Sequence, residues 1–219
     1  MKKNKMSFEI IPSIVTSDSQ LLLDEIRQIE TMTDKSQIDL MDGRFIPLKS
    51  ISPQELAPIK TNLFLIAHLM VFKPETYLKP LAVAGIKETI FHYETTSDPF
   101  SLIRSIKGEG MGASVAIKLE TPVQVLDPLI SQVDSVVFLA VEPRVFGSPF
   151  QPKVLDKINA FRRRYPKVII GVDGGIRLEN IKLVKAHGID KVYVGTAIFS
   201  SVAPSKNFQA LKDAAGDSP

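Results

Sequence analysis

The stretch VIIGVDGG, residues 168–175, decides the fold class of this chain. It is a continuous apolar run that ends in an aspartate and two glycines, and VVFLAV at residues 136–141 is a second run of this kind. An alternating pattern would indicate a strand with one face in water, whereas a run that is apolar on both faces is typical of a parallel strand covered by helices. The sequence therefore predicts an α/β fold with a buried parallel sheet.

Eight such β-rich runs alternate with eight stretches of helical period, several of which open with proline in the first turn. Eight β-then-α units in a chain of this length predict a single (β/α)8 barrel. A doubly wound open sheet is the rival, but the first predicted strand lacks the glycine-rich turn that such folds place after it. The predicted strands are 9–15, 37–42, 63–71, 88–94, 113–118, 135–142, 167–173 and 191–195. The predicted helices are 20–31, 53–60, 74–84, 99–108, 122–131, 152–165, 178–187 and 204–215.

The length and composition of the chain fit one globular domain over residues 1–219, with a short N-terminal extension over about residues 1–7 and a frayed tail over about residues 215–219. Net charge is +3, but the basic residues are dispersed, and the run RRR at 162–164 fits a solvated helix face better than a nucleic-acid site. The absence of cysteine excludes disulfides and thiolate nucleophiles. With no sustained apolar segment for export or membrane insertion, we expect a cytoplasmic protein without nucleic-acid or membrane partners.

Two aspartates and a histidine close three of the predicted strands: Asp39, His68 and Asp173. Residues at the carboxyl ends of barrel strands face one mouth, so these side chains can converge on a divalent metal. Gln37 lies two residues before Asp39 and points the same way, where a fourth ligand would be expected. Two carboxylates with imidazole suit Fe²⁺, Mn²⁺, Co²⁺ or Zn²⁺, and the residue types do not choose among them. The same carboxylates, on opposite sides of a substrate, could move protons on both faces of one carbon.

Each of these residues also has a plainer interpretation. A lone strand-end aspartate more often caps the following turn than performs catalysis, and His92 could simply hydrogen-bond inside the barrel mouth. The coincidence of such residues at several strand ends is what favours a site. Glycines add a second signal, because Gly174 and Gly175 follow the seventh strand and Gly195-Thr196-Ala197 follows the eighth, where barrels commonly bind phosphate.

Together these residues resemble the ribulose-phosphate 3-epimerase family over roughly residues 9–200. The segments around Met41-Asp42-Gly43 and His68-Leu69-Met70 are highly specific to that family. The matching pieces are PSI at 12–14, DLMDGRFIP at 39–47, HLMV at 68–71, HYE at 92–94, VDGGI at 172–176 and VGTAIF at 194–199.

The resemblance implies a (β/α)8 barrel that interconverts D-ribulose 5-phosphate and D-xylulose 5-phosphate by inverting C3. It implies a divalent metal that stabilises a cis-enediolate, with Asp39 and Asp173 as metal-bound acid and base and His68 as a further ligand. Ser13 would contact substrate hydroxyls, and two methionines would form a soft wall beside the intermediate. The full set of substrate contacts implied is Ser13, His68, Met41, Met70, Gly147, Gly174, Gly175, Gly195, Thr196 and Ala197.

The departures from the family are also informative. Gln37 stands where the family has a second metal-ligand histidine, and its amide oxygen is a weaker donor, so we expect weaker metal binding or a preference for a harder ion. The loop over residues 142–150 has lost most of the family's glycines, and its Arg144 and Phe146 would stiffen a lid that must close. Lys118 and Glu142 replace uncharged residues at adjacent strand ends, and we predict that they pair within 4 Å.

Three hypotheses follow for function. The leading one is the ribulose-phosphate 3-epimerase activity itself, because both proton-transfer aspartates, His68 and the phosphate glycines are all present. The second is an epimerase or isomerase of another phosphorylated ketose, which the charged ring of Lys118, Glu142 and Arg144 motivates. The third is a catalytically silent sugar-phosphate-binding relative. In each case the partner is a small sugar phosphate, and self-association into a homo-oligomer is left open.

Overall fold

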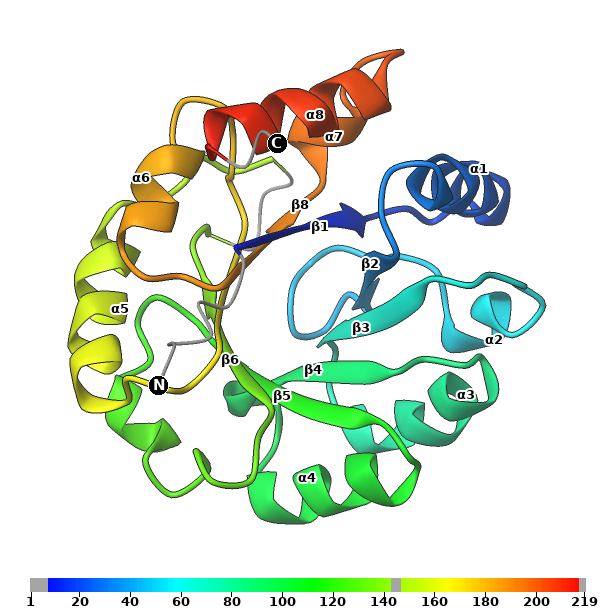
Figure 1. Cartoon of the computed structure of the whole chain (residues 1–219). Coiled ribbons are helices and arrows are strands. Elements are labelled where there is room, and N and C mark those ends of the chain that lie inside the picture. Colours follow the sequence, from blue (N-terminus) through cyan, green and yellow to red (C-terminus); the bar gives the residue numbers. More distant parts are fainter. Residues whose placement is uncertain (1–7, 143–146, 217–219) are drawn as a thin grey trace, which may run out of the picture.

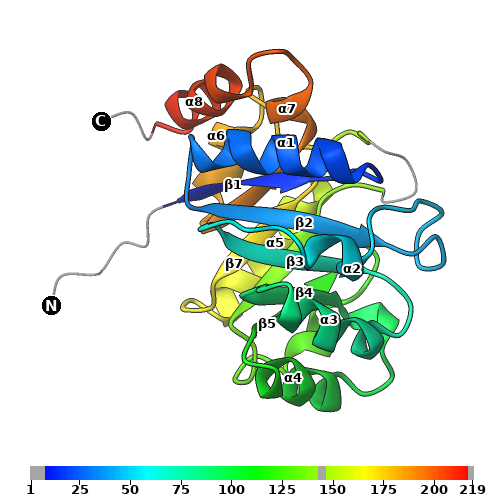
Figure 2. The same ribbon diagram turned by 90° about the vertical axis from the view of Figure 1, so that its right-hand side faces the viewer.

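The computed structural model describes residues 8–142 and 147–216, and its eight parallel strands close into one barrel in chain order. Figure 1 shows the ring of strands with the helices outside it, and Figure 2 shows the strands from the side. The predicted (β/α)8 barrel is therefore confirmed. The strands are β1 (Glu9–Ile14), β2 (Lys35–Met41), β3 (Phe64–Met70), β4 (Glu88–His92), β5 (Gly112–Ile117), β6 (Ser135–Leu139), β7 (Ile170–Asp173) and β8 (Lys191–Val194).

Helices and 3₁₀ turns follow the strands. The α-helices are α1 (Ser19–Glu30), α2 (Pro53–Leu56), α3 (Leu78–Val83), α4 (Pro99–Gly108), α5 (Lys153–Arg164), α6 (Ile181–Ala186), α7 (Thr196–Phe199) and α8 (Pro204–Ala214). The 3₁₀ turns are η1 (Pro74–Tyr77), η2 (Tyr93–Thr95) and η3 (Val123–Leu126). No helix within residues 8–142 and 147–216 is long and apolar enough to cross a membrane.

Helix α1 illustrates how the sequence builds the outer layer. The Asp18 side chain accepts hydrogen bonds from the backbone N–H groups of Gln20 and Leu21, which satisfies two donors at the helix start. Leu22, Ile26 and Ile29 then recur at helical spacing and are buried. One face of the helix therefore packs on the barrel while its opposite face stays in water.

Prolines explain two differences from the sequence prediction. The helix predicted over 122–131 is reduced to the 3₁₀ turn η3, and the helix predicted over 53–60 stops after the single turn α2. Pro128 and Pro58 lack the N–H that would continue each helix, and their rings clash with the preceding turn. Helix α7 was not predicted, because a four-residue helix is too short to show a period in the sequence. The expected extension at 1–7 and the end of the tail at 217–219 lie outside the described residues.

The barrel interior is filled by side chains in layers. A middle layer of buried apolar side chains separates the two ends of the barrel: Ile11, Ile66, Ile90, Ala116, Val137 and Tyr193. Gly171 leaves room for the large ring of this layer, because a Cβ atom there would lie 3.0 Å from Tyr193 Cε2. Space below and above this layer is left for polar side chains.

The amino-terminal end of the barrel holds a paired polar group that we call the lower cluster: Glu88, Ser114, Ser135 and Lys191. Lys191 Nζ lies 3.1 Å from Glu88 Oε1, and both side chains are nearly buried. Ser114 Oγ donates to the same carboxylate at 2.6 Å and lies 2.7 Å from Ser135 Oγ. Each charge in this cluster therefore has a partner, as a buried ion pair requires.

Candidate active site

Three strands bring a second polar group together toward their carboxyl ends, which we call the mouth cluster: Gln37, Asp39, His68 and Asp173. Asp39 on β2 and His68 on β3 are direct partners in the strand register. Gln37 lies two residues earlier on β2, where its side chain points to the same side as Asp39, and it pairs with Ser13 of β1. Asp173 ends β7 from across the barrel. All four side chains are buried, so their contacts are made largely without water.

His68 stands between the two carboxylates. Its Nδ1 atom is 2.9 Å from Asp173 Oδ2 and 3.2 Å from Asp39 Oδ1. Among the described residues, however, Nδ1 has no hydrogen-bond partner. Both oxygens are close enough, so the angle at Nδ1 is what prevents a hydrogen bond to either one. The nitrogen and the two oxygens therefore surround a common point rather than forming separate bonds.

Gln37 also contacts both carboxylates. Its Nε2 atom lies 2.8 Å from Asp39 Oδ1, 2.8 Å from Asp173 Oδ2 and 3.1 Å from Ser13 Oγ. Its Oε1 atom is buried and has no hydrogen-bond partner in the described part of the chain. The predicted inward direction of Gln37 is thus correct, but the amide presents its donor nitrogen to the carboxylates.

A second histidine supports His68 from behind. The Nε2 atoms of His68 and His92 are 3.0 Å apart, so one ring must donate and the other accept. If His68 uses the Nδ1 lone pair for a ligand, its Nε2–H donates to His92. The Nδ1 atom of His92 then faces Glu94 Oε2 at 3.4 Å. His92 therefore hydrogen-bonds inside the barrel mouth, as its plainer interpretation held.

The electrostatics of the mouth cluster follow from burial and crowding of charge. Burial raises the pKa of Asp39, and the Asp173 carboxylate adds to this, while the nearby His68 imidazole acts the other way. Burial alone would lower the pKa of His68, but the two carboxylates outweigh it and raise that pKa to about 9. Burial lowers the pKa of His92 to about 4. The site therefore favours positive charge at His68 and a neutral imidazole behind it.

Glu94 anchors the end of this chain of contacts. Burial would raise its pKa, but hydrogen bonds outweigh that effect and lower the pKa to about 2. The carboxylate accepts from the backbone N–H of Lys118 at 2.8 Å and from the Thr121 hydroxyl. Glu94 is thus a firmly held anion at the mouth of the barrel.

The donor set fits a divalent cation. One oxygen or nitrogen from each of Asp39, His68 and Asp173 lies within 4.8 Å of the others. Ligands with bonds of about 2.0 to 2.2 Å to one ion lie about 3.0 to 3.4 Å apart, close to the distances between His68 Nδ1 and the two carboxylates. The buried, poorly partnered Nδ1 atom of His68 is the observation that favours a shared ion over hydrogen bonds alone.

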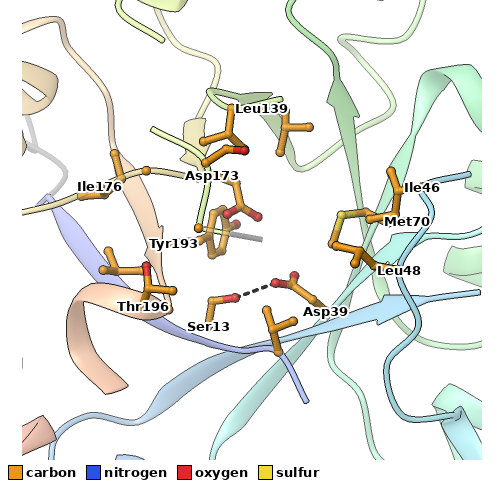
Figure 3. Close-up of a pocket in the computed structure, with 18 of the residues that line it drawn as sticks. Ser13, Asp39, Ile46, Leu48, Met70, Leu139, Asp173, Ile176, Tyr193 and Thr196 are labelled. Atoms are coloured by element: carbon orange, nitrogen blue, oxygen red, sulfur yellow. Dashed lines mark hydrogen bonds between the residues drawn. The ribbon is translucent and has the colours of Figure 1, made fainter. Parts of the chain in front are cut away.

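A pocket opens above the mouth cluster, and Figure 3 shows Asp39, Asp173 and Ser13 directed into it. Ser13 Oγ donates to Asp39 Oδ2 at 3.0 Å. Met41 and Met70 are register partners on β2 and β3 and line one wall with Ile46. Of the substrate contacts implied by the resemblance, the pocket is lined by Ser13, Met41, Met70, Gly147, Gly174, Gly175, Gly195 and Thr196. His68 is fully buried behind this wall, and Ala197 packs on the hydrophobic core instead.

Glycines are required by the backbone on one side of the pocket. Gly174 and Gly175 have φ of +100° and +70°, a region that other residues rarely adopt. A Cβ atom on Gly175 would lie 2.5 Å from the backbone nitrogen of Phe150, so a side chain cannot be placed there without moving the loop. Gly195 is also confined, with 3.0 Å between its ideal Cβ and the carbonyl oxygen of Ser13.

The contacts of the charged Lys118 at the barrel mouth differ from the prediction. Lys118 places Nζ 3.9 Å from the centroid of the Phe45 ring, and no ion pair joins Lys118 to Glu142 among the described residues. The predicted pair within 4 Å is therefore wrong, because the aromatic face attracts the ammonium group instead. Arg144 and Phe146, which we expected to stiffen the loop, lie outside the described residues.

Some pocket residues were missed by sequence reasoning. Tyr193 rises from the middle layer, and its buried hydroxyl has no hydrogen-bond partner among the described residues. The available signal was its place in β8, two residues before Gly195, where the side chain points into the barrel. Leu48 and Ile46 come from the loop after β2 and line the pocket without any periodic pattern that could have identified them.

The fold and the mouth cluster together define a class of protein: a (β/α)8-barrel enzyme with paired carboxylates and a candidate metal site at the carboxyl ends of its strands. Comparison with known proteins narrows this class. The ribulose-phosphate 3 epimerase family matches residues 9–199. The chain belongs to the ribulose-phosphate 3-epimerase family, and it is an enzyme of the isomerase class.

Individual relatives agree over nearly the whole length. The cytoplasmic isoform of ribulose-phosphate 3-epimerase from Oryza sativa subsp. japonica is 34% identical, with 93% of this chain and 92% of the relative covered. The ribulose-phosphate 3-epimerase of Schizosaccharomyces pombe is 32% identical, with 94% and 92% covered.

Solved structures at lower identity share the fold. 3-Hexulose-6-phosphate synthase from Salmonella typhimurium superposes with a TM-score of 0.71 at 16% identity, covering 96% of this chain and 99% of that one. Phosphoribosyl anthranilate isomerase from Thermococcus kodakaraensis gives a TM-score of 0.70 at 15% identity, covering 97% and 100%. At these identities the likeness concerns the barrel alone.

Proposed function

We propose that the protein interconverts D-ribulose 5-phosphate and D-xylulose 5-phosphate by inverting the configuration at C3. The observation that carries the proposal is the pair of carboxylates, Asp39 from β2 and Asp173 from β7, that line one pocket from different sides of the barrel. Inversion needs a proton acceptor on one face of a carbon and a proton donor on the other. Family membership supports the same activity.

The two aspartates exchange roles with the direction of the reaction. One carboxylate takes the proton from C3, and the electrons of the broken C–H bond enter an enediolate that spans C2 and C3. The other aspartate, protonated at that moment, returns a proton to the opposite face of C3. Ser13 orients the acid–base pair, because its hydroxyl donates to Asp39 at 3.0 Å. Proton transfer by positioned groups of this kind contributes about 10² to 10⁴ in rate.

A divalent cation, Fe²⁺, Mn²⁺, Co²⁺ or Zn²⁺, is the proposed cofactor. Asp39, His68 and Asp173 would hold it, and Gln37 stands at the position of a fourth ligand. When bound, the cation supplies positive charge that stabilises negative charge on the substrate oxygens. His92 keeps the imidazole of His68 in place, since the Nε2 atoms of the two rings are 3.0 Å apart.

The remaining pocket residues would bind the substrate. Met41 and Met70 form an apolar wall beside the carbon chain, and soft thioethers adapt to an irregular surface. Backbone N–H groups near Gly174, Gly175, Gly195 and Thr196 would complement the phosphate, because glycine permits close approach of the main chain. Gly147 would contact the substrate from the loop after β6, and Ala197 would lie near the phosphate.

No specific observation favours either alternative hypothesis. The charged ring of Lys118, Glu142 and Arg144 motivated a different ketose, but no ion pair joins Lys118 to Glu142 among the described residues, and Arg144 lies outside them. The intact carboxylate pair speaks against a silent binding protein. We also propose a cytoplasmic location, supported by the rice relative named as a cytoplasmic isoform. Whether the protein forms a homo-oligomer is best decided by light scattering.

The proposal is tested by assaying purified protein. The protein is stripped with a chelator and supplied with Fe²⁺, Mn²⁺, Co²⁺ or Zn²⁺ in turn, and formation of D-xylulose 5-phosphate from D-ribulose 5-phosphate is followed. We expect turnover with at least one metal. Absence of turnover under all four conditions, while D-ribulose 5-phosphate still binds, would refute the proposed activity.

A further inference from the structure

Gln37 combines three contacts that a metal ligand would not make. Its Nε2 atom lies within hydrogen-bond distance of Asp39 Oδ1, Asp173 Oδ2 and Ser13 Oγ. The amide nitrogen carries two hydrogens and no lone pair for a metal. As oriented, the side chain therefore acts on the carboxylates as a cation would, by placing partial positive charge between them.

The orientation of this amide follows from its neighbours. Swapping the two ends of the carboxamide would place Oε1 about 2.8 Å from two carboxylate oxygens, where acceptor faces acceptor. Amide nitrogen and oxygen have nearly the same shape, so the hydrogen-bond pattern is what distinguishes them. The donor-inward orientation is therefore favoured while no divalent cation lies between the carboxylates.

The opposite end of the amide completes the argument. Gln37 Oε1 is buried and lacks a hydrogen-bond partner among the described residues. Gln37 is also fully inaccessible to bulk solvent. An unpaired buried acceptor is costly, so this orientation is held by the contacts of Nε2 with the two carboxylates and with Ser13. A cation between Asp39 and Asp173 would remove that hold and attract Oε1, because an amide oxygen can coordinate a divalent ion.

We propose that Gln37 is a two-state residue of the metal site. Its amide nitrogen bridges Asp39 and Asp173 when no cation is present, and the carboxamide turns over to offer its oxygen when a divalent cation binds. This inference rests on the proposed function, in that the same carboxylates hold the metal. Its consequence is a carboxylate pair that stays in place without metal, together with a metal affinity lowered by competition from the amide.

Variants at this position separate the two states. Gln37→Glu keeps the size of the side chain but replaces the donor with a third carboxylate. It should lower the melting temperature of chelator-treated protein and tighten Zn²⁺ binding. Gln37→His should also bind Zn²⁺ more tightly, by about tenfold or more, the scale on which single groups around metal sites change affinity. Gln28→His, at an exposed position on α1, controls for a histidine added to the surface.

The direct test is the side-chain amide signal of Gln37 in ¹⁵N-labelled protein, assigned by its loss in Gln37→His. In chelator-treated protein we expect a signal protected from solvent exchange. Saturation with Zn²⁺ should shift it, and Zn²⁺ titration calorimetry on the same samples gives the affinities.

The outcomes distinguish this inference from the proposed function. If Zn²⁺ binds the wild type and Gln37→His equally and leaves the amide signal unchanged, the two-state role is overturned while the metal site stands. If neither protein binds any of the four metals, the metal site is wrong and the inference falls with it.

Discussion

The two ends of the barrel carry polar clusters of similar size and opposite character. At the amino-terminal end, Lys191 neutralises Glu88 and two serine hydroxyls complete the group. At the carboxyl end, Asp39 and Asp173 bring two carboxylates to one point, beside a His68 nitrogen and a Gln37 oxygen that lack hydrogen-bond partners among the described residues. A middle layer of apolar side chains separates the clusters.

This difference shows how structure and function divide within one fold. A buried ion pair that is satisfied holds strands in place and has no free group with which to react. Buried carboxylates that crowd together retain an unmet demand for positive charge, which a cation or a substrate can satisfy. The lower cluster should therefore control stability alone, and the mouth cluster should control activity.

The largest expected effect comes from Asp173→Asn. The substitution keeps shape but removes one proton-transfer group, so kcat should fall by about 10³-fold or more. The unfolding free energy should change little, because an amide oxygen can still accept from Gln37 Nε2. Steady-state kinetics and urea unfolding measure the two quantities, with Asp156→Asn on the exposed face of α5 as the matched control. Retained turnover would remove Asp173 from the acid–base role.

Lys191→Met breaks the opposite cluster. It leaves Glu88 as a buried charge without its partner, and both side chains are about one-tenth exposed. We expect a loss of about 3 kcal/mol in unfolding free energy. The kcat of the folded variant should match the wild type, and Lys191→Met combined with Glu88→Gln should recover part of the loss. A fall in kcat without loss of stability would contradict the division of roles.

Glu94 gives a pH-dependent test, because it sits at the mouth but is fully partnered. Its pKa is lowered to about 2 from an ordinary value of 4.5, so its stabilising contribution is present above pH 4.5 and is lost as the pH falls toward 2. The contribution at neutral pH should be about 2 kcal/mol, after discounting for partial exposure. The stability gap between wild type and Glu94→Gln should therefore narrow from pH 4.5 to pH 2. A gap that is constant with pH would mean that Glu94 is not held as an anion.

The smallest expected effect concerns the corrected contact of Lys118. A double-mutant cycle with Lys118→Met and Phe45→Leu should give a coupling free energy of about 0.5 to 1 kcal/mol, typical of an ammonium over an aromatic ring. Thermal unfolding of the four proteins is sufficient. Zero coupling would show that the ammonium does not remain on the Phe45 ring in solution.

Much of this organisation could be predicted from the sequence, for physical reasons that particular residues make clear. The strand around Gly171 was predictable because a parallel strand buried on both faces is apolar throughout. The inward direction of Asp39 and Gln37 followed from the two-residue period of a strand. The helix predicted over 122–131 failed because the helical period was given more weight than Pro128.

Contacts between distant strands could not be predicted in this way. The donor orientation of Gln37 depends on Ser13 and Asp173, which reach it from β1 and β7. For Lys118 we predicted an anion, Glu142, as the partner, whereas the packing of the loop after β2 places the Phe45 ring under its ammonium group. In both cases the sequence supplied the right residue types while three-dimensional placement chose the partner.

The central claim is that the mouth cluster removes and replaces the C3 proton of a ketose phosphate. The most direct measurement is NMR of D-ribulose 5-phosphate incubated with the metal-loaded protein in D₂O. We predict that D-xylulose 5-phosphate forms and carries deuterium at C3, because the proton returned to that carbon comes from an aspartate in exchange with solvent. If the substrate binds but neither D-xylulose 5-phosphate nor deuterium at C3 appears, the mouth cluster does not perform this proton transfer.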